Sequence, residues 1–136
     1  MDKSIKVLQE NNLKTTHARR VVLELFLGEK MPITADDIFS YLGKMKCDTD
    51  RATVYRILDA FVEKGIINKM EFQEGKYRYE IAGSDHHHLI CEKCGSISDI
   101  SDCGVSEWEE QIRSKKGFIV KRHALEFFGI CPACQR

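Results

Sequence analysis

Two Cys-x-x-Cys pairs carry the strongest chemical signal in the sequence. Cys91 and Cys94 form the first pair, and Cys131 and Cys134 form the second. Both sulfurs of such a pair can reach one ion, so the two pairs supply the four thiolates of a tetrahedral zinc site. Four thiolates close the coordination shell and leave no open position for a catalytic water. We therefore predict a structural Zn²⁺ bound by these four cysteines, with two redox-active or unrelated thiol pairs as the alternative.

A run of metal-ligand side chains directly precedes the first cysteine pair: Asp85, His86, His87 and His88. On a strand, alternate residues project to opposite faces, so this run would serve two separate sites. The first candidate site consists of Glu80, His86, His88 and Asp99. The second contains Asp85, His87 and His123. Mixed imidazole and carboxylate ligands suit Zn²⁺, Fe²⁺ and Mn²⁺ without choosing among them, and the alternative is a solvated polar loop.

The N-terminal residues predict four helices that would lie ahead of these ligands. We expect helices over 2–11 and 17–27, a third helix capped by Thr34, and a fourth capped by Thr49 or Asp50. The fourth helix has the clearest apolar stripe, made of Val54, Ile57, Leu58, Phe61 and Val62. Its opposite face carries Arg51, Thr53, Tyr55, Arg56 and Asp59.

A β-hairpin should follow the fourth helix. Residues 66–72 and 76–82 flank Gln73-Glu74-Gly75, and the second of these runs alternates between polar and apolar side chains. Helices followed by a hairpin in this order predict a winged helix-turn-helix, in which the fourth helix reads DNA and the hairpin forms the wing.

The C-terminal half should form a second, smaller domain after a hinge at Gly83-Ser84. Trp108 and Ile112 are expected on the buried face of its helix. The predicted elements are strands near 87–91 and 96–100, a helix near 104–116, and a final strand near 118–129. The chain as a whole is thus expected to be α+β, with a winged-helix DNA-binding domain over 1–82 and a smaller metal-binding α/β domain over 83–136.

Charge and composition limit the possible functions. The 136 residues contain 21 basic and 21 acidic side chains, so neither half is a strongly basic nucleic-acid module and any DNA site must rely on a local cluster. No apolar leader and no run long enough to span a membrane is visible, so we expect a cytoplasmic protein with no membrane partner. Its cysteines would then stay mostly reduced, which favours metal binding over disulfides. Cys47 and Cys103 have no comparable partners and are expected to be incidental.

Several stretches together resemble the ferric uptake regulator (Fur) family of metal-dependent repressors. The matching stretches are Leu13-Lys14-x-Thr16-x-x-Arg19, Thr34-Ala35-Asp36-Asp37-Ile38, Ala52-Thr53-Val54-Tyr55-Arg56-Ile57-Leu58, Gly65-Ile66-Ile67, His86-x-His88-Leu89-Ile90-Cys91-x-x-Cys94-Gly95 and Cys131-x-x-Cys134. Their joint order is more specific than any one of them. The resemblance implies a homodimeric, metal-activated repressor that binds palindromic operator DNA, with residues 83–136 as its α/β dimerisation domain.

The resemblance also implies roles for individual residues. The implied DNA contacts are Lys14, Arg19, Arg51, Thr53, Tyr55 and Arg56. The implied regulatory ligands are Glu80, His86, His88 and Asp99, although Met31-Pro32 stands where many members of the family supply a further histidine. The implied second site is Asp85, His87, His123 and Glu107. In that site Ser106 replaces the usual helix glutamate, so Glu107 or Glu110 would have to compensate.

We therefore expect a repressor of metal uptake and homeostasis genes, with a structural zinc and a regulatory Zn²⁺, Fe²⁺ or Mn²⁺. Trp108 and Phe128-Gly129 slightly favour the zinc-sensing branch over iron sensing. One alternative is a zinc-stapled adaptor that binds proteins and no DNA. A zinc deaminase is disfavoured because His123-x-x-Glu126 and Cys-Pro-x-Cys have the wrong spacing and order, so we expect no enzyme.

Overall fold

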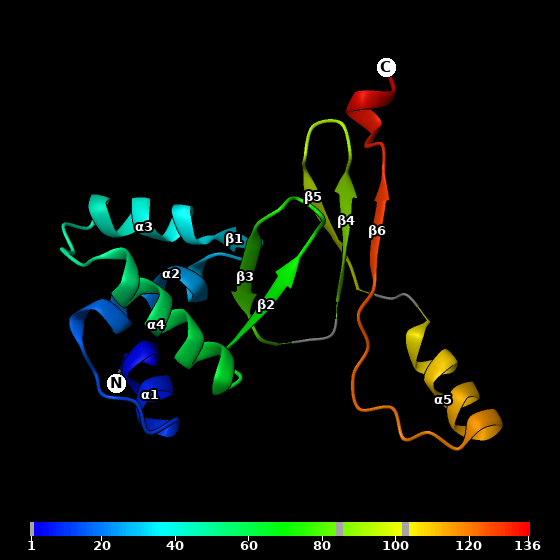
Figure 1. The fold of residues 1–136 in the computed structure, drawn as a ribbon, viewed down its shortest axis with the longest axis horizontal. Coiled ribbons are helices and arrows are strands. Elements are labelled where there is room, and N and C mark those ends of the chain that lie inside the picture. The colour runs from blue at the N-terminus through cyan, green and yellow to red at the C-terminus, as the bar shows by residue number, and fades with distance from the viewer. Residues whose placement is uncertain (1, 84–85, 102–103) are drawn as a thin grey trace. The chain divides into compact units, whose positions relative to one another are not determined.

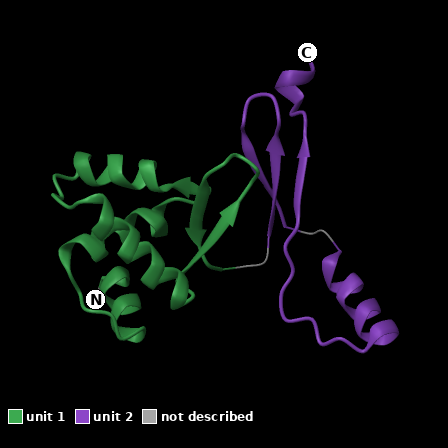
Figure 2. Ribbon diagram, in the orientation of Figure 1, with its two compact units in different colours: residues 1–83 green, residues 84–136 purple. Residues whose placement is uncertain are grey.

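The computed structural model describes residues 2–83, 86–101 and 104–136, so Asp85 and Cys103 lie outside the described residues. Contacts divide the chain into unit 1, Met1–Gly83, and unit 2, Ser84–Arg136 (Figures 1 and 2). The elements of unit 1 are α1 (Lys3–Glu10), α2 (His17–Gly28), β1 (Ile33–Thr34), α3 (Ala35–Lys44), α4 (Arg51–Glu63), β2 (Ile67–Glu71) and β3 (Tyr77–Ile81). Those of unit 2 are β4 (His87–Cys91), β5 (Ile97–Ile100), α5 (Val105–Lys116), β6 (Glu126–Gly129) and the short 3₁₀ helix η1 (Pro132–Gln135).

Side-chain caps fix where the helices of unit 1 begin. Thr16 accepts a hydrogen bond from the backbone N–H of Arg19 at the start of α2, and Asp50 accepts one from Thr53 at the start of α4. Thr34 and Asp37 form a reciprocal capping box at the start of α3. The sequence offered both Thr49 and Asp50 as the N-cap of α4, and in the structure the N-cap is Asp50.

The core of unit 1 lies where the helices pack on the small sheet. The apolar stripe of α4 is buried as predicted, with Phe61 and Leu58 fully enclosed and Val62 partly so. Phe26 of α2 and Leu42 of α3 contribute to the same core. Burial of this one face leaves the opposite face of α4 exposed to solvent.

The sheet of unit 1 has the order β1-β3-β2 and is antiparallel throughout. The hairpin of β2 and β3 was predicted, but the short strand β1 was not, because Ile33 and Thr34 read as the opening of a helix. Tyr79 pairs with Ile33 and Lys69 and is buried, whereas Tyr77 is 55% exposed near the turn of the hairpin. The turn end of the hairpin is therefore exposed to solvent, while Tyr79 packs in the core of unit 1.

Unit 2 is built on a sheet of order β5-β4-β6, in which β4 pairs antiparallel with β5 and parallel with β6. The final strand is shorter than the predicted 118–129, since only Glu126–Gly129 pairs. The expectation that Trp108 and Ile112 face a core was wrong, because they are 55% and 40% exposed and Val105 is the buried residue of α5. The apolar side of α5 thus lacks a covering element within the described part of the chain.

A search of the described residues found no helix with the length and apolar character needed to cross a lipid bilayer.

Candidate metal centres and nucleic-acid interface

The four cysteines of the two Cys-x-x-Cys pairs come together in unit 2. Parallel pairing places Cys91 opposite Gly129, which brings the turn after β4 next to the turn before η1. The four sulfurs all lie within 4.8 Å of one another, and the sulfurs of Cys94 and Cys131 are 3.8 Å apart. Tetrahedral zinc with Zn–S bonds of about 2.3 Å separates its sulfurs by about 3.8 Å. The arrangement therefore fits a structural zinc.

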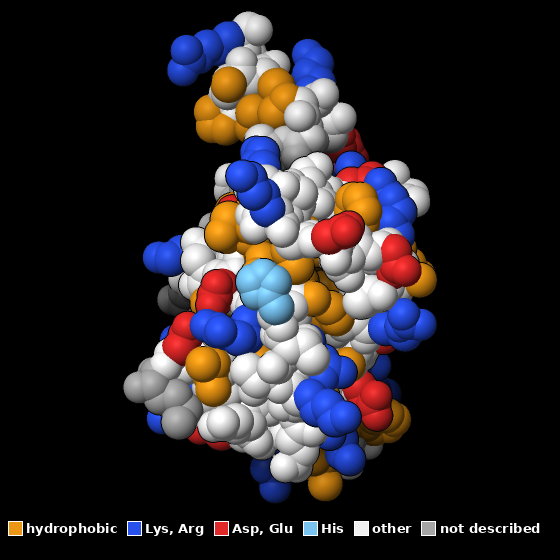
Figure 3. Space-filling model, turned by 90° about the vertical axis from the view of Figure 1, so that its left-hand side faces the viewer, with side chains coloured by type: hydrophobic (Ala, Val, Ile, Leu, Met, Phe, Trp, Pro, Cys, Tyr) orange, Lys and Arg blue, Asp and Glu red, His pale blue; other side chains and the backbone are white. Residues whose placement is uncertain are grey.

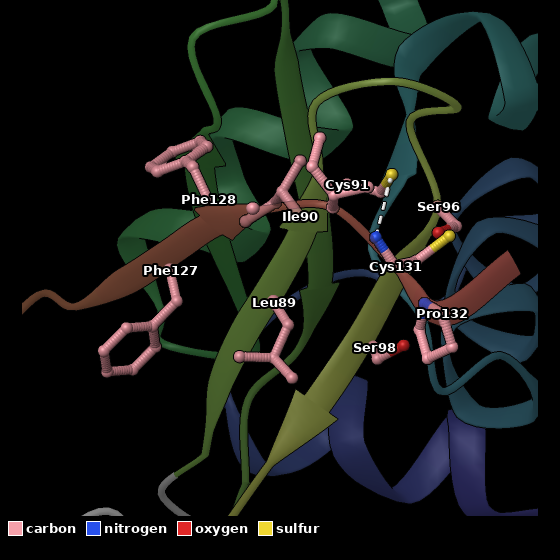
Figure 4. A pocket seen from close by; sticks show the side chains of 11 residues that line it. Leu89, Ile90, Cys91, Ser96, Ser98, Phe127, Phe128, Cys131 and Pro132 are labelled. Atoms are coloured by element: carbon pink, nitrogen blue, oxygen red, sulfur yellow. Dashed lines mark hydrogen bonds between the residues drawn. The ribbon is translucent and has the colours of Figure 1, made fainter. Parts of the chain in front are cut away.

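Electrostatics within the cysteine cluster also indicate a cation. The backbone N–H of Cys131 donates to the sulfur of Cys91 at 3.3 Å (Figure 4), and this bond, with others from the first knuckle, lowers the pKa of Cys91 to about 6. In contrast, hydrogen bonds to Cys131 and Cys94 raise the pKa of Cys134 to about 12. Four sulfurs this close cannot all ionise on their own, since each thiolate disfavours the next. A divalent cation removes that conflict.

Two histidines and a carboxylate meet on one side of β4. The rings of His86 and His88 lie edge to face with centroids 4.9 Å apart. Asp99 of β5 is the register partner of His88, and its Oδ1 lies 3.8 Å from His88 Nε2. His88 is buried and Asp99 is partly exposed. The remaining predicted ligand, Glu80, lies on β3 and so belongs to unit 1.

His87 points to the other side of β4, where it meets His123. Its Nδ1 lies 3.1 Å from the carbonyl oxygen of Leu125, which can only accept, so Nδ1 carries the proton. The Nε2 atoms of His87 and His123 are 3.2 Å apart. Two imidazoles on one tetrahedral Zn²⁺, with Zn–N bonds of about 2.0–2.1 Å, place their nitrogens about 3.3 Å apart. The 3.2 Å spacing fits two ligands of one ion and equally fits a hydrogen bond between the two imidazoles.

The carboxylate that the structure places beside His123 is Glu109, which sequence reasoning missed. Its Oε1 lies 3.6 Å from His123 Nδ1, on the nitrogen that does not face His87. A carboxylate on that side is the kind of group that orients a ligand histidine, although 3.6 Å is longer than a hydrogen bond. The predicted Glu107 is instead exposed in the first turn of α5, where its charge suits the helix dipole. The predicted Asp85 lies outside the described residues.

Replacing Glu109 by glutamine should weaken metal binding at the His87–His123 pair by about 10–100-fold, because the imidazole of His123 loses its orienting partner. The measurement is a Zn²⁺ competition titration with a chelator, in a His86→Ala/His88→Ala background whose cysteine site is already filled. Glu110→Gln, one residue away and exposed, is the matched control. Equal affinities for the two variants would remove Glu109 from the site.

The predicted DNA contacts lie on exposed surfaces of unit 1. Arg51, Tyr55 and Arg56 are exposed on the outer face of α4, and Thr53 accepts a hydrogen bond from Arg56 Nη2 at 3.1 Å. Arg51 is already engaged: it forms a 2.8 Å ion pair with Asp36, and its guanidinium lies 4.6 Å from the ring centre of Phe39. The remaining two contacts are neighbours, since Arg19 Nη1 donates to the carbonyl of Lys14 at 3.1 Å.

A hollow of about 250 Å³ lies between α4 and the hairpin of β2 and β3. It is lined by Tyr55 of α4, by Asp36 at the start of α3, and by Lys76 and Tyr77 of the wing, among others. Lys and Arg side chains on the face of the molecule shown in Figure 3 are interspersed with Asp and Glu. Neither sign of charge dominates that face, in keeping with the neutral net charge of the chain.

Comparison with known proteins assigns these features to one family. The model of the ferric uptake regulator family matches residues 10–128. The chain is 32% identical over 136 residues to the peroxide operon regulator of Bacillus subtilis, covering 100% of this chain and 94% of that protein. It is 33% identical over 131 residues to the ferric uptake regulation protein of Bordetella parapertussis, covering 95% and 94%.

A solved structure agrees with the sequence comparison. The Helicobacter pylori ferric uptake regulator, described as having three functional metal-binding sites, superposes with a TM-score of 0.83 at 25% identity, covering 97% of this chain and 89% of that one. The alternative of an adaptor without DNA binding has no support, since the relatives named above are regulators. The chain belongs to the ferric uptake regulator family and is a metal-binding, DNA-binding transcription regulator, not an enzyme.

Proposed function

We propose that this chain is a homodimeric repressor of metal uptake and homeostasis genes that binds palindromic operator DNA when its regulatory site holds metal. The observation that carries the proposal is the convergence of His86, His88 and Asp99 on one side of β4. These are mixed nitrogen and oxygen ligands and are distinct from the four cysteines. Such a site suits a reversibly bound ion, whereas the closed cysteine site suits a permanent one.

The proposed regulatory ligands are Glu80, His86, His88 and Asp99. Because Glu80 belongs to unit 1 and the others to unit 2, one ion held by this set would link the reading unit to the rest of the chain. Residues 29–33 contain no histidine that could add a further ligand to this set. In this segment the backbone N–H of Met31 donates a hydrogen bond to the Glu29 side chain. We propose zinc as the sensed ion, with Fe²⁺ and Mn²⁺ as the competing outcomes of the test.

We propose a second ion at His87 and His123, with Glu109 orienting His123 in place of the predicted Glu107 and with Asp85 as a further candidate ligand. The two imidazole nitrogens at 3.2 Å support this site. The Helicobacter pylori relative is described as having three functional metal-binding sites, which is a precedent for more than one ion per chain in this family.

The exposed apolar surface of unit 2 supports assembly of two copies. Side chains of the sheet, including Leu89 and Phe127, line a hollow of about 260 Å³ (Figure 4). Phe118 and Ile119, between α5 and β6, are 69% and 82% exposed. Large apolar side chains that are this exposed are typical of interaction surfaces. We propose that a second copy covers it, which would place two recognition helices on a palindromic operator.

The proposed reading residues are Lys14, Arg19, Arg51, Thr53, Tyr55 and Arg56. Four of them are exposed on unit 1 and the other two, Arg19 and Thr53, are partly exposed, which supports this, as does the chemistry of α4. Arg56 can donate to guanine edges, and Tyr55 can contact thymine methyl groups. The ion pair between Arg51 and Asp36 supports a role for Arg51 near the DNA backbone, with its guanidinium held in place beforehand.

The test is a DNA-binding titration with and without metal. The DNA is a labelled duplex carrying the sequence that the wild-type protein enriches from a randomised library. Adding Zn²⁺ to protein that retains only its cysteine-bound zinc should tighten binding by about 5–150-fold, because an allosteric coupling of 1–3 kcal/mol is typical. Fe²⁺ under anaerobic conditions and Mn²⁺ are titrated in parallel. Equal affinity with chelator and with every metal, while circular dichroism shows folded protein, contradicts the proposal.

A further inference from the structure

Arg78 joins three parts of unit 1 through its guanidinium. Its Nε donates to Glu74 Oε2 at 2.8 Å and its Nη2 donates to Glu74 Oε1 at 3.2 Å. Its Nη1 donates to the carbonyl oxygen of Pro32 at 3.1 Å. The side chain on β3 thus holds both the turn of the wing and the segment that leads into β1 and α3.

This pairing is stronger than an ordinary surface ion pair. Two parallel N–H···O bonds to one carboxylate have a fixed geometry, and only 16% of the Arg78 side chain and 21% of the Glu74 side chain are exposed. The hydrogen bond from Arg78 lowers the pKa of Glu74, so the carboxylate stays ionised at neutral pH. Such a pair fixes the positions of Arg78 and Glu74 relative to each other, whereas a mobile surface ion pair does not.

The turn that Arg78 holds has a demanding backbone conformation. Gln73 and Gly75 both have positive φ angles, 63° and 77°. The carboxylate of Glu71 accepts a hydrogen bond from the N–H of Glu74 at 2.9 Å, which closes the turn from its other side. Glu74 is therefore fixed at both its backbone and its side chain, and the position of the following Gly75-Lys76 depends on that fixation.

The other end of the clamp reaches the start of α3. Pro32 is two residues before Thr34, whose capping box begins that helix. Thr34 and Asp36 from this end, and Gly75, Lys76 and Tyr77 from the wing, line the hollow beside Tyr55 of α4. Arg78 consequently connects the two segments, the wing turn and the start of α3, that line this hollow together with the proposed recognition helix α4.

We propose that Arg78 is a positioning residue of the DNA-reading surface, which sets the wing turn against the start of α3 without itself binding DNA. The inference rests on the proposed function only in taking α4 and the wing as the surface that meets DNA. The Arg78 side chain is only 16% exposed, and its guanidinium makes three hydrogen bonds within the protein, so it is poorly placed to bind phosphate.

The variants Arg78→Gln, Glu74→Gln and the double variant test this role. We expect each single variant to weaken binding to the library-selected duplex by about tenfold at saturating Zn²⁺, which corresponds to the loss of one charge-assisted pair. The double variant should bind no worse than either single variant, since both remove the same clamp. Arg20→Gln, which removes another arginine ion pair of unit 1, is the matched control and should bind like wild type.

The behaviour of Glu74→Gln separates positioning from direct contact. Removing a negative charge beside DNA should strengthen binding if Arg78 were a phosphate ligand, because the arginine would be released. It should weaken binding if Arg78 and Glu74 act as a clamp. The salt dependence is the second readout: a lost phosphate contact reduces the slope of log K against log salt by about 0.9, whereas a lost clamp leaves it unchanged.

Three results would overturn the proposal: tighter binding by Glu74→Gln, a smaller salt slope for Arg78→Gln, or wild-type affinity for both single variants. Near-ultraviolet circular dichroism at the assay temperature confirms that each variant is folded. Failure of the wild-type protein to bind any enriched duplex with metal would instead contradict the proposed function, so the two failures are distinguishable.

Discussion

Replacing Cys131 by serine is expected to release the chelator-resistant zinc and unfold unit 2. Cys131 supplies a thiolate to the cluster, and its backbone N–H also bonds to Cys91, so its loss affects both knuckles. Structural zinc sites contribute about 10–16 kcal/mol of binding free energy, more than a unit of this size gains from its small core. Elemental analysis after dialysis against a chelator should show about one equivalent of zinc fewer per chain than in wild type.

Cys47→Ser is the matched control for this loss. Cys47 is a buried cysteine of unit 1, and its replacement should keep the zinc while lowering the stability of unit 1 by about 1–3 kcal/mol, the usual cost of burying a hydroxyl. Chelator-resistant zinc in Cys131→Ser, together with an intact thermal transition of unit 2, would rule out the four-sulfur site.

Replacing His88 by alanine is expected to abolish the effect of metal on DNA binding. His88 is buried, contacts Asp99 and lies beside His86, so the proposed regulatory site loses its central ligand. The affinity of the variant in Zn²⁺ should fall to that of chelator-treated wild type, a loss of about 5–150-fold. The measurement is the ratio of affinities with and without Zn²⁺, with the cysteine-bound zinc retained throughout.

His17→Ala controls for the loss of an imidazole elsewhere. His17 is exposed at the start of α2 and belongs to neither histidine cluster, so its variant should keep the wild-type ratio. Asp99→Asn is an independent check, because its partly exposed side chain can be changed with little effect on the core. A wild-type ratio in both His88→Ala and Asp99→Asn would show that regulation uses other ligands.

The sequence predicted those features that depend on local pattern. The stripe of α4 was readable because its spacing matches one helix face, and that face is the buried one. The division of the histidine run between two sides of a strand followed from the two-residue period of strands, and the structure pairs His88 with Asp99 and His87 with His123. Both patterns are properties of a single element.

The features that the sequence did not reveal depend on how elements meet. Glu109 was missed because a helix offers several glutamates, and only the packing of α5 against the segment after it decides which reaches His123. Trp108 was assigned to a core, but its side chain is 55% exposed among the described residues. The link from Arg78 to Pro32 joins residues far apart in sequence, so no local period indicates it.

The parallel pairing of β4 with β6 has a consequence for how the protein matures. Cys91 and Cys94 are synthesised long before Cys131 and Cys134, and β4 cannot gain its parallel neighbour until α5 and the segment after it have emerged. A nascent polypeptide therefore holds only half of the sulfur ligands until the second knuckle leaves the ribosome. Molecules made during zinc starvation would fail to close unit 2, while those made earlier keep their ion, so the age of a molecule would determine whether it can act.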